Sequence, residues 1–86
     1  MASYSLDFSR TARKQLGSLP HDDQVRLLRA IRQLVDDPRP RGCRKLQGAV
    51  DTFRIRVGYY RVIYEIEGSR LVILVLKLGH RKDIYR

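Results

Sequence analysis

The pattern of apolar and polar positions predicts a strand and two helices in the first half of the chain. Apolar and polar residues alternate along residues 4–8, which is the period of a short half-buried strand. Ser9 is placed to cap a helix through TARKQL, and the sequence GSLP ends it. A second helix is expected from about Asp22 to Asp36, where apolar residues recur at helical spacing.

The second half of the chain returns to a period of two. The segments TFRIRV, YYRVIYEI and RLVILVLKL are separated by turn signals at Gly58 and EGS, which predicts an antiparallel meander. Residues 36–48, rich in proline and glycine, are expected to form a loop. The sequence therefore predicts one α+β domain over residues 1–86, ordered β-α-α-β-β-β, with two N-terminal helices packed on one face of a small antiparallel sheet.

The net charge of the chain restricts the classes of partner that it is expected to bind. Eighteen Lys and Arg, most of them Arg, stand against nine Asp and Glu, giving a net charge of +9. This density indicates a polyanion, with nucleic acid first, because guanidinium groups match phosphate and base edges. A membrane surface is not expected, because the helices lack a basic face opposite aromatic anchors. Without a secretory signal at its N-terminus, the chain is expected in the cytoplasm.

The cysteine and histidine residues indicate no metal site and no cofactor. A single cysteine, Cys43, excludes an internal disulfide and the usual zinc clusters. A catalytic thiolate is conceivable in its basic loop, but an ordinary loop cysteine is favoured because no histidine is close in sequence. His21, which precedes an acidic pair, is expected at the surface where the second helix begins.

Cations on the outer side of the predicted sheet form the candidate site. Arg54 and Arg56 alternate with apolar residues, so their side chains should project about 7 Å apart from one face. Arg61 joins them if the apolar set of the next strand is core, and Lys77 and Arg81 extend the surface. An ordinary solvated face is the alternative, because antiparallel sheets often have one. Scarce carboxylates and interleaved tyrosines favour a surface that holds RNA phosphates and stacks bases.

Four segments in order, FSRTARKQLGSLP, KLQG, FRIRVGYYRVIYEI and VLKLGHRKDIYR, resemble the RelE/ParE superfamily of toxins, specifically the RelE-type mRNA interferases of type II toxin–antitoxin systems. The resemblance implies a RelE-like fold and a metal-independent endoribonuclease that cleaves mRNA at the ribosomal A site and so inhibits translation. It also implies an acidic, RelB-like antitoxin, in a hetero-oligomeric complex that binds operator DNA through the antitoxin.

The resemblance carries roles over by position. Arg54 and Arg56 fall where the family has two functional basic residues, commonly lysines, and Arg61 matches the arginine of its GYR element. Arg81 matches the arginine after the last strand, and Tyr85 a C-terminal tyrosine that stacks on a base or takes part in catalysis. The expected RNA-binding residues are Lys45, Arg54, Arg56, Lys77 and Lys82.

Proton transfer needs a residue other than arginine, which stays protonated in proteins. His80 is the only histidine near the cluster, so it is predicted as base or acid, with Tyr85 as its partner or as a stacking platform. A structural role for His80 at the end of the last strand is the alternative. The expected catalytic residues are Arg61, His80, Arg81 and Tyr85.

Two other functions stay open at this point. One is a ParE-like inhibitor of DNA gyrase with the same fold and no nuclease chemistry. The other is a non-catalytic module that binds RNA or the ribosome. The nuclease is favoured because ParE-type toxins generally lack the full set of cations and the tyrosine.

Overall fold

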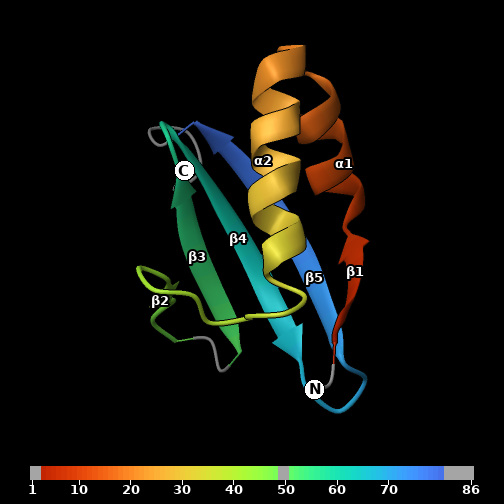
Figure 1. Cartoon of the computed structure of the whole chain (residues 1–86), viewed down its shortest axis with the longest axis vertical. Helices are drawn as coiled ribbons and strands as arrows, with labels where there is room; N and C mark the ends of the chain where they lie inside the picture. The colour runs from red at the N-terminus through yellow and green to blue at the C-terminus, as the bar shows by residue number, and fades with distance from the viewer. Residues whose placement is uncertain (1–2, 49–50, 81–86) are drawn as a thin grey trace.

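The computed structural model of the chain describes residues 3–48 and 51–80. Its elements in chain order are β1 (Ser5–Phe8), α1 (Arg10–Gly17), α2 (His21–Gln33), β2 (Arg44–Lys45), β3 (Thr52–Val57), β4 (Tyr60–Glu67) and β5 (Val72–His80). The predicted α+β fold is confirmed, with two helices packed against a sheet of strand order β1-β5-β4-β3-β2 (Figure 1). None of the helices in these residues is long and apolar enough to cross a membrane.

The sheet differs from the predicted one in two details. β1 pairs with β5 in the parallel direction, with Ser5 opposite Val72, so the sheet is mixed. Residues 44 and 45, expected in a loop, form the two-residue strand β2 on the outer edge of β3, where Arg44 lies opposite Arg54. A strand of two residues has no periodicity to reveal it in sequence.

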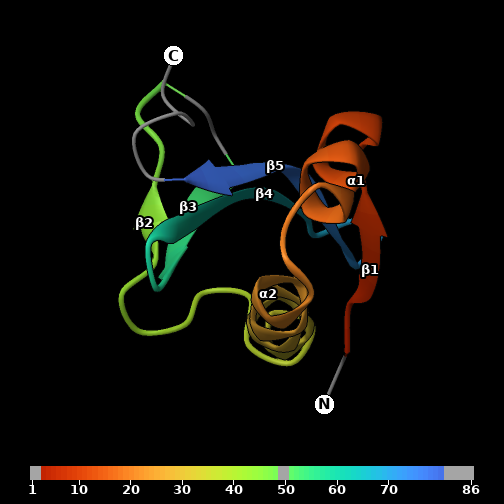
Figure 2. The same cartoon turned by 90° about the horizontal axis from the view of Figure 1, so that it is seen from above.

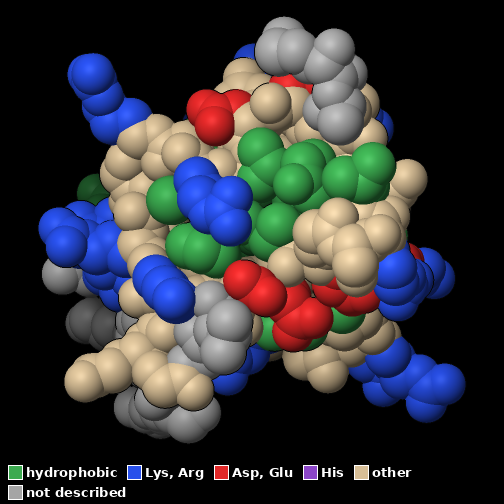
Figure 3. Space-filling model, turned by 90° about the horizontal axis from the view of Figure 1, so that it is seen from below, with side chains coloured by type: hydrophobic (Ala, Val, Ile, Leu, Met, Phe, Trp, Pro, Cys, Tyr) green, Lys and Arg blue, Asp and Glu red, His purple; other side chains and the backbone are tan. Residues whose placement is uncertain are grey.

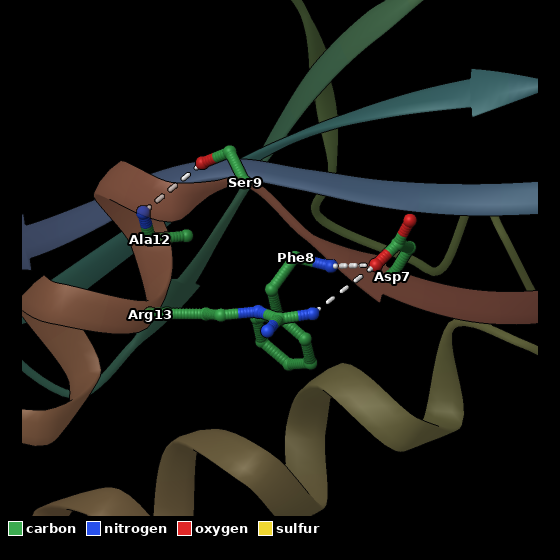
Figure 4. Close-up of polar contacts among 5 residues, drawn as sticks. All are labelled: Asp7, Phe8, Ser9, Ala12 and Arg13. Carbon is green, nitrogen blue, oxygen red and sulfur yellow. Dashed lines mark hydrogen bonds and ion pairs between the residues drawn. The ribbon is translucent and has the colours of Figure 1, made fainter.

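α1 completes the edge of β5 beyond the point where β1 ends. Ser9 caps α1, because its Oγ accepts a hydrogen bond from the backbone N–H of Ala12 at 3.0 Å (Figure 4). The same hydroxyl donates to the carbonyl of Leu76 at 2.6 Å. Gln15 Oε1 accepts from the N–H of Leu78 at 2.7 Å. Side chains of the helix thus satisfy backbone groups that would otherwise be left unpaired at a sheet edge.

The core lies between α2 and the face of the sheet that it covers (Figure 2). Leu27, Ile31 and Leu34 are buried against apolar residues of β3, β4 and β5. Tyr64 is fully buried, and its hydroxyl donates to the carbonyl of Pro38 at 2.6 Å. This bond ties the loop after α2 to the middle of the sheet, and burial raises the pKa of Tyr64 above its usual value.

The register of β3 and β4 assigns their side chains to the two faces. Ile55 lies opposite Val62 in the core, so the neighbouring pair, Arg56 opposite Arg61, projects from the other side. We call this side, opposite α2, the outer face. The predicted alternation of β3 and β4 is therefore present in the structure.

Candidate functional site

Cations line up across the strands of the outer face in two rows. The first row runs from β2 to β5 through residues that lie directly opposite one another, Arg44, Arg54, Ile63 and Lys77. The second row runs from β3 to β5 through Arg56, Arg61 and Gly79. Neighbours within a row have Cβ atoms about 5 Å apart, and the rows are about 7 Å apart along β3. We call these seven positions the arginine rows.

Two pairs of arginines face each other within the rows, which is an unfavourable arrangement for folding. Arg44 lies opposite Arg54, and Arg56 lies opposite Arg61. Like charges in directly opposite positions of a sheet destabilise it. In the described part of the chain, Arg44 and Arg54 make no ion pair that would offset the repulsion. Such a cost is typical of residues kept for binding an anion rather than for stability.

The burial of Arg61 distinguishes this surface from an ordinary solvated face. Only 8% of Arg61 is exposed, and it is the one charged residue that is buried among residues 3–48 and 51–80. Burying a guanidinium removes much of its hydration, whereas a solvated charge would lie in water. Opposite it on β5 lies Gly79, and no described atom lies within 4 Å of the position a Cβ would take there.

A groove continues the positive surface around the edge of β3. It has a volume of about 490 Å³ and lies between the end of α2, the loop after it and β3. Four arginines line it, Arg41, Arg44, Arg54 and Arg56, together with a single carboxylate from Asp37. This balance of charge favours an anionic occupant.

Carboxylates gather at the opposite end of the sheet. Asp51, Glu65 and Glu67 line a cavity there, next to the β4–β5 turn. Viewed onto this end, Figure 3 shows acidic side chains beside a group of hydrophobic ones. Glu65 lies on the outer face, because it is opposite Thr52, two residues from Arg54. The outer face is therefore polarised along its strands, and the cations lie toward the β3–β4 turn.

His80 lies at the end of the sheet, next to the arginine rows but not in them. It is opposite Tyr60, whose parity is that of the core. Its ring is parallel to that of Tyr59, with centroids 6.3 Å apart and planes 11° apart, and edge-on to that of Tyr60 at 6.2 Å. The Tyr60 hydroxyl donates to Asp23 of α2 at 2.8 Å, and this bond raises the pKa of Tyr60. The catalytic role of His80 stays a prediction.

The other predicted site residues divide into three groups. Arg54, Arg56, Arg61 and Lys77 come together in the rows. Lys45 does not, because it lies opposite Phe53 and so on the side of the sheet away from Arg54. Residues Arg81, Lys82 and Tyr85 lie outside the described residues.

Arg41 and Arg44 were not predicted from the sequence as residues that contact a polyanion. The available signal was the concentration of basic residues in the loop 36–48. Cys43, in the same loop, packs against the core, which agrees with an ordinary loop cysteine. His21 is exposed and is the first residue of α2, as expected.

Comparison with known proteins gives consistent matches over nearly the whole chain. Residues 6–85 match the family described as "ParE toxin of type II toxin-antitoxin system, parDE". Toxin RelG of Mycobacterium tuberculosis is 33% identical over 88 residues, covering 96% of this chain and 97% of RelG. The mRNA interferase toxin RelE of Escherichia coli K12 is 27% identical over 82 residues, covering 93% and 85%. The archaeal RelE–RelB complex of Pyrococcus horikoshii OT3 matches with a TM-score of 0.82 and 35% identity, covering 94% of this chain and 98% of that one.

Proposed function

The chain belongs to the ParE toxin family of type II toxin–antitoxin systems, and on that premise we propose that it is a toxin that cleaves mRNA as a metal-independent endoribonuclease. One observation favours the nuclease over the gyrase inhibitor. Arg56 and Arg61 lie opposite each other on the outer face, and Arg61 is buried. The similar E. coli protein is an mRNA interferase, which supports the same activity here. We propose the ribosomal A site as the place of cleavage.

The proposed chemistry is attack of a 2′-hydroxyl on the adjacent phosphate. That reaction needs a base for the hydroxyl proton, cations for the charge that develops on the phosphorane, and an acid for the departing 5′-oxygen. Arg56 and Arg61 supply the cations, and the low exposure of Arg61 strengthens its effect because less water screens its charge.

Residues outside the arginine rows must act as acid and base, because a guanidinium does not give up its proton. His80 follows Gly79, which lies opposite Arg61, so it lies at the same end of the sheet as the arginine pair. We propose His80 as base or acid. Arg81 and Tyr85 complete the proposed set through an added cation and a phenol that stacks or donates. Arg54, Lys77 and Lys82 hold the flanking phosphates.

We further propose a RelB-like antitoxin as the partner of this toxin. Several of the similar solved structures are RelE–RelB complexes, from P. horikoshii and E. coli among others. An acidic antitoxin chain would complement a net charge of +9. The resulting hetero-oligomer would bind operator DNA through the antitoxin, because the antitoxin would already occupy the cations of the toxin.

Mapping of mRNA 5′ ends in translating ribosomes with purified toxin tests the function. New ends should appear that carry a 5′-hydroxyl, and the upstream products should end in a 2′,3′-cyclic phosphate. Arg56→Ala should slow cleavage on the order of 100-fold by removing transition-state charge stabilisation. Arg70→Ala is the matched control: it also removes one exposed arginine, but from an ion pair with Glu67 near the β4–β5 turn, and should cleave normally. Gyrase-linked DNA breaks without new mRNA ends would refute the nuclease.

A further inference from the structure

Tyr59 is an exposed aromatic residue that the fold does not require. It is 77% exposed, whereas Val25 and Leu71, the other large hydrophobic residues exposed in the described part of the chain, are 42% and 41% exposed. The β3–β4 turn consists of Gly58 and Tyr59, and its positive φ of 62° is at the glycine. Such a largely exposed ring points to contact with a ligand.

The ring is held in place through a chain of contacts that begins on α2. Asp23 accepts the hydrogen bond of the Tyr60 hydroxyl, Tyr60 meets His80 edge-on, and His80 lies parallel to Tyr59. In this arrangement the flat faces of Tyr59 and His80 are parallel without any ligand. A preoriented surface loses less entropy on binding than a mobile one.

The surroundings of the two rings are cationic. Arg56 lies two residues before Gly58 and opposite Arg61 on the outer face. Both lie at the same end of the sheet as Tyr60 and His80, which have the parity of the core. From the helix side, the guanidinium of Arg26 comes within 3.8 Å of the position a Cβ would take on Gly58. A flat aromatic surface bordered by guanidinium groups suits a nucleic-acid base, because every base has a stacking face and is attached to phosphates.

We propose that Tyr59 and His80 form a base-stacking platform for a nucleotide next to the phosphate held by Arg56 and Arg61. The proposal rests on the proposed ribonuclease function and adds to it a residue that fixes the position of the substrate. In this platform Tyr59 stacks on the base, and the ring of His80 lies parallel to that of Tyr59. Stacking then aligns the neighbouring phosphate with the arginine pair.

The platform is tested by removing the ring of Tyr59 and the base of the RNA, each alone and both together. Single-turnover cleavage is measured in ribosomes programmed with a short mRNA that carries an abasic nucleotide at each position of the A-site codon and its neighbours in turn. Tyr59→Ala should slow cleavage of the normal mRNA about tenfold, from the typical contribution of one stacked base. At one position the abasic nucleotide should slow the wild type equally, and should slow Tyr59→Ala no further.

Two variants separate the ring from general effects. Tyr59→Phe keeps the stacking face and should cleave at the wild-type rate. Leu71→Ala removes an exposed apolar side chain at the opposite end of the sheet and should also cleave normally. If the abasic nucleotide and Tyr59→Ala slow cleavage by factors that multiply at every position, the platform is refuted. The proposed nuclease function is not affected by that result. Loss of antitoxin binding in Tyr59→Ala with normal cleavage would also overturn the platform, by assigning the ring to a protein contact. A wild type that cleaves nothing would refute the proposed function itself.

Discussion

Reversing the charge of Arg44 should stabilise the fold and weaken binding to RNA. Arg44 is exposed and lies directly opposite Arg54, in a groove where four arginines meet one carboxylate. With their charged ends about 7 Å apart in water, the two guanidinium groups repel each other by about 0.6 kcal/mol. This value falls within the range of about 0.2–1 kcal/mol measured for cross-strand pairs. Arg44→Glu turns this repulsion into attraction, so the free energy of unfolding should rise by about 1 kcal/mol.

Thermal denaturation at low ionic strength measures this gain. For a chain of this size, about 1 kcal/mol corresponds to a rise in Tm of about 4–8 °C. In 1 M salt the screening length is about 3 Å, so the difference between Arg44→Glu and the wild type should nearly vanish. Binding to a single-stranded RNA should weaken at the same time, because the groove loses a cation and gains a carboxylate.

Arg70→Gln serves as the control of opposite sign. It breaks the 2.8 Å ion pair with Glu67, so it should lower stability slightly or leave it unchanged. An Arg44→Glu variant that melts below the wild type at low salt would refute the repulsion across β2 and β3. A gain in Tm that persists in 1 M salt would refute its electrostatic origin.

Three further changes test other parts of the structure. Ser9→Ala removes both the cap of α1 and the bond to Leu76, and should lower the free energy of unfolding by about 2 kcal/mol in denaturant titration, whereas the exposed Ser18→Ala should cost much less. Because the pKa of Tyr64 is raised in the folded state, its contribution to stability is present below pH about 10 and is lost as the pH rises further. Thermal melts should show this alkaline loss in the wild type and a smaller one in Tyr64→Phe. His80→Gln should slow single-turnover mRNA cleavage far more than it weakens RNA binding, and unchanged kinetics would remove this histidine from proton transfer.

Alternation made the sheet predictable where one face of a strand is buried and the other is not. In β3 the core positions of Phe53 and Ile55 alternate with Arg54, so both the strand and its two faces follow from the sequence. The parallel pairing of β1 with β5 did not follow, because alternation carries no information about the direction of a distant partner.

The same limit explains what was missed at the site. Lys45 was predicted to bind RNA together with Arg54. The two-residue strand β2 instead turns Lys45 to the side of Phe53 and brings Arg44 beside Arg54. The place of His80 at the end of the last strand followed from the sequence, but the tyrosine rings beside it come from the turn and from β4. Such contacts depend on tertiary packing, which short-range patterns do not encode.

The bond between Ser9 and Leu76 joins residues 67 positions apart in the chain. β1 and α1, although synthesised first, find their partner only in β5, the last strand. Contacts of such long range slow folding, because a long loop must close before they form. The second row likewise ends at Gly79, so a growing chain has no complete outer face. The order of synthesis thus delays assembly of the RNA-facing surface until the final strand has been made.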